Sequence, residues 1–320
     1  MNTTQVFENQ DFIGMYASDY IETGRKEGLP VSLWANIWME HEICCLFART
    51  NVGKSVMAVQ IANEVAGAGK RVLYLDFELS PQQFASRYVD TTGTPTRLDP
   101  RLIIATLSAK SQSYRRMSDY IDRIEEFVLS VKADALVIDN LTALCFTTEC
   151  ADSASELMSA LKALCKRRRL SILLIGHTPK IEEGRPLELT NLAGSMRLAN
   201  LMDAAFSMGR GFDSEGNEVR YIKHLKARSS ALAYDENNVA VFTLETNPLR
   251  FKFVRTAPEY ILIEKLRPET DPGVRSRFQM PSAEKMERLR SLIDSGAKAT
   301  DICSQLHISP NKLAILRKML

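Results

Sequence analysis

Short apolar runs that alternate with segments of helical period constrain the fold of this chain more than any other feature. The runs are uninterrupted, so strands built from them would be buried on both faces. Such strands, alternating with helices, predict an α/β domain with a mostly parallel sheet, extended by hairpin-like antiparallel strands at its end. The expected strands are Cys44–Phe47, Val72–Phe77, Leu102–Ala105, Ala135–Ile138, Ile172–Ile175, Ala204–Met208, Tyr221–Leu225 and Val239–Leu244, with helices at Ser55–Ala66, Ser80–Tyr88, Ser118–Val131 and Ser153–Lys166.

The rest of the chain divides around this core. Residues 1–40 are expected to form an N-terminal leader or interface segment with a helix near Phe12–Thr23, and residues 41–264 to form the α/β domain. Residues 265–282 are rich in proline and charge without periodicity, which is typical of a linker. Residues 283–320 read as a small all-α domain of three helices, Ala283–Ile293, Ala299–Leu306 and Ser309–Leu316.

Composition indicates a soluble protein of a reducing compartment. The 320 residues include 25% charged side chains, and the sequence has no run of 18 apolar residues that could span a membrane. The first residues lack the basic-then-apolar pattern of a signal peptide. The six cysteines form no C-x-x-C pair, so structural thiols are expected rather than a metal site. We therefore expect a cytoplasmic protein.

One segment has the sequence and the context of a phosphate-binding loop. It runs Ala48-Arg49-Thr50-Asn51-Val52-Gly53-Lys54-Ser55, after an apolar strand and before an amphipathic helix. Backbone N–H groups and the helix dipole would attract phosphates, and the ammonium group of Lys54 would neutralise them. The hydroxyl of Ser55 would bind Mg²⁺. Ala48 replaces the usual first glycine, and it is tolerated if its φ angle is negative.

Two apolar strands end in acidic residues. Asp139 ends the strand that begins at Ala135, and it is expected to hold Mg²⁺ through water and to position Ser55. Glu78 follows the strand that begins at Val72, and it is the candidate general base that polarises the attacking water, with Asp76 as its competitor. Alternatively, either acid caps the helix at Ser80.

A polar pair follows the strand Ser171–Gly176. His177 and Thr178 would lie beside the γ-phosphate as a sensor, unless they only form hydrogen bonds within their loop.

Taken in order, these motifs resemble a known family. Ala48–Ser55, Phe77–Pro81, Leu136–Asn140 and Ile175–Thr178 are similar to those of RecA-fold ATPases of the DnaB-type helicase and plasmid RepA-type group. The likeness is greatest to AAA-family proteins of Bacteroidetes mobile elements, and it covers about residues 30–255. The resemblance implies a RecA-like fold that hydrolyses ATP with Mg²⁺ in a ring or filament, with a hexamer among the possible sizes.

The resemblance also implies a catalytic contribution from a neighbouring subunit. Lys226 and Arg228 match a Lys-x-Arg pair that reaches the neighbour's γ-phosphate, where cations stabilise the charge of phosphoryl transfer. The alternative is a basic strand end that faces solvent. Two segments, Thr147–Ser153 and Pro179–Gly194, match loops that bind nucleic acid in the central channel. Neither is basic, so their sequences argue against translocation along a strand.

Positive charge gathers in the tail. Lys265–Leu320 holds 11 basic and 6 acidic residues, against 30 and 33 in the remainder. Residues 299–316 fit a helix-turn-helix unit, although His307 stands where the turn usually has glycine. The resemblance places Ser309, Asn311, Lys312 and Ile315 at bases and Lys298, Arg317 and Lys318 at phosphates; the alternative is a protein-interaction module. The basic run Lys166–Arg169, by contrast, ends a helix, where cations interact favourably with the negative end of the helix dipole.

These expectations combine into one functional hypothesis and two alternatives. The first is an oligomeric DNA-associated ATPase that drives helicase-like or remodelling work in mobile-element replication or transfer. The second is a non-translocating, ATP-dependent DNA-binding regulator that recruits a partner. The third is an ATPase that acts only on protein. Dinucleotide-dependent enzymes are disfavoured because no G-x-G-x-x-G follows the first strand.

Overall fold

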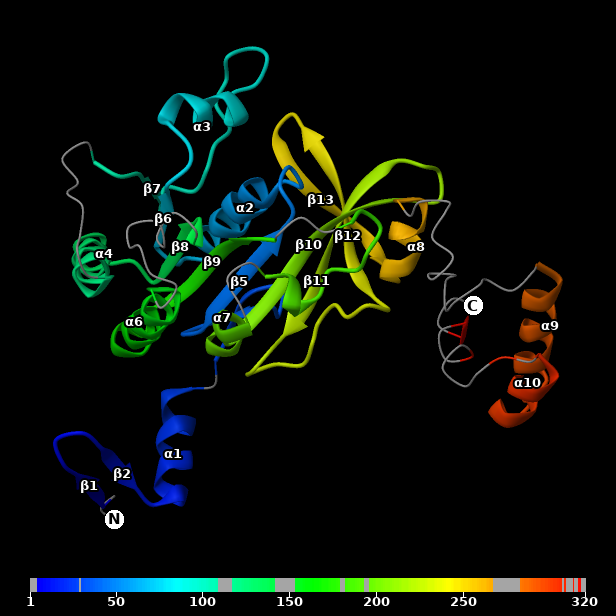
Figure 1. The fold of residues 1–320 in the computed structure, drawn as a ribbon, viewed down its shortest axis with the longest axis horizontal. Helices are drawn as coiled ribbons and strands as arrows, with labels where there is room; N and C mark the ends of the chain where they lie inside the picture. The colour runs from blue at the N-terminus through cyan, green and yellow to red at the C-terminus, as the bar shows by residue number, and fades with distance from the viewer. Residues whose placement is uncertain are drawn as a thin grey trace.

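A nine-stranded sheet covered by helices on both faces forms the body of the molecule (Figure 1). The computed structural model describes residues 5–28, 30–108, 117–141, 153–178, 182–192, 196–266, 283–306, 308, 313 and 316–317. For 153–154, 196–198, 265 and 283–284 it describes the backbone alone. The strand order is β13-β12-β11-β10-β5-β9-β8-β6-β7.

Five parallel strands form one half of this sheet. Four of them are buried as the sequence predicts, whereas the edge strand β7 is only partly buried. The apolar runs coincide with these strands, because only a strand covered on both faces can bury consecutive apolar side chains. The carboxyl ends of all five meet at one edge of the sheet. The strands are β5 (Ile43–Ala48), β9 (Ser171–His177), β8 (Ala135–Asp139), β6 (Val72–Asp76) and β7 (Leu102–Ala105).

Four longer strands extend the sheet beyond β5. The first, β10 (Ala204–Phe212), pairs parallel to β5, and each following strand pairs antiparallel to the one before it. These are β11 (Glu218–Lys226), β12 (Val239–Thr246) and β13 (Leu249–Ala257). The predicted antiparallel extension is thus confirmed, although β13 is a strand that the apolar runs did not predict.

Helices on the two faces enclose two separate apolar layers. On one face, α2 (Lys54–Gly67) packs Met57 and Ile61 against the sheet. The opposite face is covered by α4 (Met117–Val131), α6 (Ser153–Arg168) and α7 (Met196–Leu201), which surround Phe47 and Leu161. The remaining elements of the domain are α3 (Pro81–Tyr88), η1 (Leu189–Asn191), α8 (Glu259–Ile263) and η2 (Glu264–Leu266). This is a RecA-like α/β fold.

The N-terminal segment projects from this body (Figure 1). A small hairpin of β1 (Val6–Glu8) and β2 (Ile13–Met15) precedes α1 (Ala17–Glu27), so the helix begins later than the predicted Phe12. A second hairpin, β3 (Ser32–Trp34) with β4 (Trp38–Met39), joins the body. Trp38 is fully buried there.

The C-terminal segment begins with α9 (Ala283–Asp294) and α10 (Ala299–Gln305), close to two predicted helices. Leu289, Ile302, Leu306, Leu313 and Leu316 bury one another in a small core of their own. Most of the third predicted helix, Ser309–Leu316, lies outside the described residues. In the part of the chain that the structure describes, no helix combines the length and apolarity needed to cross a membrane.

Candidate active site

The predicted phosphate loop connects β5 to α2 at the carboxyl edge of the sheet. Gly53 is the N-cap of α2 and has a φ of 103°, in the left-handed region that glycine adopts without strain. A Cβ atom at Gly53 would also lie 2.7 Å from the ring of Phe251 on β13. Asn51 has a φ of 63°, which turns the loop back toward the helix. Together these two residues allow the loop to close over the N-terminus of α2, where free N–H groups bind anions.

Ala48 fits the loop because it belongs to the strand. It is the last residue of β5, fully buried, and it pairs with Met208 on one side and His177 on the other. Extended backbone in a parallel ladder requires a negative φ, which alanine adopts freely. The methyl group therefore imposes no strain at the position where glycine usually stands.

Lys54 is buried at the start of α2 with little local compensation for its charge. Its Nζ lies 3.5 Å from the backbone oxygen of Arg49, at the limit of a hydrogen bond. Burial lowers the pKa of Lys54, although the negative charges of Asp139 and Glu78 act in the opposite direction. A buried ammonium group in this setting is stabilised by an added anion. The site therefore favours a phosphate.

Asp139 and Ser55, the two expected Mg²⁺ ligands, lie together. The Asp139 carboxylate at the end of β8 is almost fully buried, and it accepts a hydrogen bond of 2.7 Å from the hydroxyl of Tyr74. Burial raises the pKa of Asp139, while the hydroxyl groups of Tyr74 and Ser55 lower it. A carboxylate beside a hydroxyl suits a hard cation that prefers oxygen ligands, so the residues present fit Mg²⁺.

Glu78 belongs to a second group of polar side chains at the same edge. Its carboxylate accepts a hydrogen bond from the side-chain amide of Asn140. The Nε2 of His177 lies 3.5 Å from Glu78 Oε1 and 3.1 Å from the Asn140 Nδ2. The structure thus brings Glu78 and His177 together, and it adds Asn140, to which the sequence analysis assigned no role.

Asp76 has a different task from Glu78. It is buried, and its Oδ1 accepts hydrogen bonds of 2.9 Å from the backbone N–H groups of Glu78 and Leu79. It therefore shapes the turn after β6. The Glu78 side chain is 41% exposed, so it remains accessible to water and to a phosphate. This geometry favours Glu78 over Asp76 as the general base. Ser80, not an acid, is the N-cap of α3.

Lys226 and Arg228 lie away from the phosphate loop of their own chain. Lys226 pairs with Ala205 at the start of β10, near the sheet edge where the parallel strands begin. Its Nζ donates to the backbone oxygen of Ala199 at 2.7 Å, and Arg228 forms an ion pair of 2.9 Å with Asp203. These cations cannot serve their own site, so a role in a neighbour's site stays a prediction.

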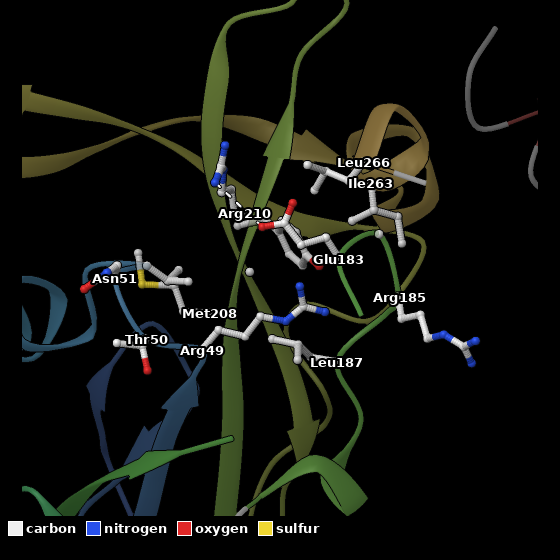
Figure 2. A pocket seen from close by; sticks show the side chains of 14 residues that line it. Arg49, Thr50, Asn51, Glu183, Arg185, Leu187, Met208, Arg210, Ile263 and Leu266 are labelled. Carbon is white, nitrogen blue, oxygen red and sulfur yellow. Dashed lines mark ion pairs between the residues drawn. The ribbon is translucent and has the colours of Figure 1, made fainter. Parts of the chain in front are cut away.

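Arg49 lies on the other side of the phosphate loop, in a pocket between this loop and residues 183–187 (Figure 2). Its side chain extends toward Leu187 and donates to the backbone oxygen of Glu182. Arg210 lies across the pocket, with a nitrogen 3.8 Å from Glu183. Although the backbone of Arg49 belongs to the phosphate loop, its side chain links that loop to the segment after β9. The other predicted loop residues, Thr50 and Val52, line the same pocket.

The basic run at the end of α6 is structural. Arg167 and Arg168 both form ion pairs with Glu125 of α4, and Arg169 lies 3.1 Å from Glu27 of α1. These partners confirm the structural interpretation of the run.

The predicted DNA-binding residues are only partly described. Lys298, the N-cap of α10, and Arg317 are exposed, while neighbouring apolar residues form the small core. Ser309, Asn311, Lys312, Ile315 and Lys318 lie outside the described residues, as do residues 147–152, 179–181 and 193–194 of the two candidate channel loops.

A family model matches the part of the chain that holds this site. Residues 28–183 match a family model described as an AAA domain, and this range includes the phosphate loop, Glu78, Asp139 and His177. No curated protein matches the sequence. Among solved structures, the flagellar accessory protein FlaH from Methanocaldococcus jannaschii is similar at 13% identity and a TM-score of 0.48, over 74% of this chain and 96% of that chain. The domain match therefore covers the residues that form the candidate site.

Proposed function

We propose that this protein is an oligomeric, DNA-associated ATPase that uses hydrolysis for helicase-like or remodelling work in mobile-element replication or transfer. One observation carries the ATPase part. A single sheet edge gathers a buried cation, a carboxylate with its hydroxyl neighbour, and a partly exposed acid beside a histidine. They are Lys54, Asp139 with Ser55, and Glu78 with His177.

Each group has a defined task in phosphoryl transfer. The N–H groups at the start of α2 and the ammonium of Lys54 would hold the phosphates in line for attack. Mg²⁺, held by Ser55 and by Asp139 through water, would neutralise phosphate charge. Glu78 would orient the attacking water and accept its proton, while Asn140 fixes the carboxylate. His177, within reach of both, would respond to the γ-phosphate.

The position of the remaining cations supports the oligomeric part of the proposal. Lys226 and Arg228 lie near the sheet edge opposite the phosphate loop, so they could contact a nucleotide only on a second copy. Arg228 is 54% exposed despite its ion pair with Asp203, which leaves it able to exchange partners. DNA association is proposed from the basic tail, in which Lys298 and Arg317 are exposed.

A specific observation favours the second candidate, a regulator that does not translocate. In the segment after β9, Arg185 forms an ion pair of 2.6 Å with Glu182. Glu183 and Glu188 add further negative charge to this segment. A loop with this balance is poorly suited to grip a phosphate backbone. In this alternative, ATP controls assembly on DNA and the tail selects the site.

The experiment that tests the proposal is ATP hydrolysis by the purified full chain, alone and with single-stranded or duplex DNA, beside Lys54→Ala. We expect turnover that the variant lacks. Stimulation by single strands would support a translocating motor. Turnover indifferent to DNA, with duplex DNA bound through the tail, would support the regulator. The absence of ATP binding, or equal turnover by Lys54→Ala, would refute the ATPase.

A further inference from the structure

The N-terminal arm, defined as residues 5–23, exposes an unusual concentration of large apolar side chains. Phe12 is 75% exposed, Ile13 68%, Tyr20 70% and Ile21 71%, and Val6, Phe7 and Tyr16 are also exposed. None of the residues of α1 is buried. Exposed large apolar side chains gathered in one segment favour a contact with another molecule.

The arm is nevertheless an organised unit. The rings of Phe7 and Tyr16 meet edge to face with centroids 5.4 Å apart, which packs the β1–β2 hairpin against the start of α1. Residues 5–23 contain Glu8, Asp11, Asp19 and Glu22 but no lysine or arginine. Because Glu22 forms an ion pair of 2.7 Å with Arg25, the negative charge of the arm comes from Glu8, Asp11 and Asp19. The arm therefore presents aromatic and acidic groups together.

A groove on the body has the complementary character. It lies between α2 and β13 and is lined by aromatic side chains, among them Trp34, Tyr234 and Phe253. Three cations line it as well, Arg97, Arg250 and Lys252. Arg250 and Lys252 share a single carboxylate, Glu245, at 2.7 and 3.5 Å, and Glu64 also lines the groove. The three cations still outnumber these two acids, so the groove keeps a positive excess.

The groove also borders an open sheet edge. Strand β13 is the last strand of the nine-stranded sheet, and Phe253 and Val254 on it are each 51% exposed. An exposed edge strand with apolar side chains is a site for added structure from another chain.

We propose that the N-terminal arm of one copy docks in the groove between α2 and β13 of a second copy. Aromatic surface would meet aromatic surface, and the acids of the arm would face Arg97, Arg250 and Lys252. The occupant is another copy, because Figure 1 shows the arm projecting from the side of the body away from α2 and β13. The ion pair of Glu27 with Arg169 fixes the base of α1 there.

This contact has a consequence for assembly. The arm and the groove are different surfaces, so each copy offers both, and the association is head to tail. Head-to-tail contacts close into a ring or continue as a filament. The inference rests on the oligomeric part of the proposed function and names the surfaces that build the oligomer.

The test uses charge reversal in the full-length chain, followed by sedimentation velocity. Asp11→Lys with Asp19→Lys changes the arm, and Arg250→Glu with Lys252→Glu changes the groove; Arg97→Glu is a second groove variant on the other wall. We expect each variant to sediment as a monomer, while ATP binding is retained. Arg123→Glu with Lys132→Glu on the α4 side is the matched control, and it should assemble like the unmodified chain.

Mixing distinguishes this contact from its alternatives. The arm variant keeps an intact groove and the groove variant keeps an intact arm. The basic arm of the first variant also faces the acidic groove of the second, so both contacts can form and the mixture should regain assembly that neither variant shows alone. Assembly unchanged in both variants would overturn the proposal. A groove variant that assembles normally but loses single-stranded DNA binding would also overturn it, with nucleic acid as the occupant. ATP binding, measured in parallel, reports separately on the ATPase proposal.

Discussion

The hydroxyl group of Tyr74 on β6 donates a hydrogen bond of 2.7 Å to the carboxylate of Asp139 on the neighbouring strand β8. Both groups are buried, so this donor is part of what keeps the carboxylate ionised in an apolar setting. The Ser55 hydroxyl also lowers the pKa of Asp139. Tyr74 would therefore act on the proposed Mg²⁺ site through Asp139.

This relationship predicts the effect of Tyr74→Phe on the pH profile of hydrolysis. The hydrogen bond lowers the pKa of Asp139, so its removal raises that pKa. Because the ionised form is needed beside Mg²⁺, activity should begin to fall at a higher pH as the solution is acidified. The measurement is kcat/KM against pH for both proteins. An acid limb that stays in place, or moves to lower pH, would contradict the role of Tyr74.

Glu78→Gln should separate nucleotide binding from hydrolysis. The amide keeps the size of the side chain but cannot accept a proton from water, so we expect kcat to fall by about 10²- to 10⁴-fold. ATP affinity should change little, because Lys54 and the loop remain. Glu126→Gln, at an exposed ion pair on α4, is the matched control. Turnover equal to that of the control would exclude Glu78 as the base.

Arg228→Ala tests whether the cation acts on a neighbouring subunit. The folded chain should lose only about 0–1 kcal/mol of stability, because the ion pair is partly exposed and Lys162 still faces Asp203 at 3.0 Å. Hydrolysis should nevertheless be lost. The Lys54→Ala variant is also expected to be inactive. A mixture of the two variants should regain activity, because some sites would then combine an intact Lys54 with an intact Arg228. A mixture without activity would argue against sharing of sites between subunits.

Much of the fold follows from local pattern. The apolar runs of β5, β8 and β9 can be placed only in a sheet covered on both faces, and their order with the helices leads to the parallel half. The strand β13 was missed because Leu249, Phe251 and Phe253 alternate with Arg250 and Lys252 instead of forming a run. That period of two, after Asn247 and Pro248, was the available signal. Strands as short as β1 and β3 carry too few residues for a pattern.

The site was only partly predictable, for a physical reason. Lys54, Ser55, Asp139, Glu78 and His177 each lie where a strand meets a loop or helix, and parallel strands bring such ends together. Tyr74 and Asn140 contribute through partners on other strands, 65 and 62 residues away in sequence. The partner of Arg228 depends on long-range packing, and no local pattern indicates Asp203.

Glu125→Gln should destabilise the domain in a pH-dependent manner. Arg167 and Arg168 lower the pKa of Glu125, so the ionised carboxylate contributes stability at neutral pH. The loss should be about 1 kcal/mol, or about 2–4 °C in Tm, because both arginines are partly exposed. The difference in stability between the unmodified protein and Glu125→Gln should shrink as the pH falls through the ordinary pKa of glutamate, about 4.3, and then through the lower pKa of Glu125 in the folded protein. Thermal unfolding of both proteins at several pH values measures the difference in Tm. A difference in Tm that does not change with pH would contradict the ion-pair explanation.

Lys298→Glu combined with Arg317→Glu should weaken DNA binding through the tail. Both side chains are exposed, whereas Leu316 beside Arg317 and Ile302 in α10 are buried, so the substitutions should leave the small core intact. If each cation contacts one phosphate, affinity should fall about tenfold or more at physiological salt, and the slope of log K against log salt should decrease by about one for each lost contact. Fluorescence anisotropy with labelled duplex across a salt series measures both quantities, with Lys285→Glu on α9 as a charge control. An affinity and a slope equal to those of the control would argue against DNA binding by the tail and favour its alternative role as a protein-interaction module.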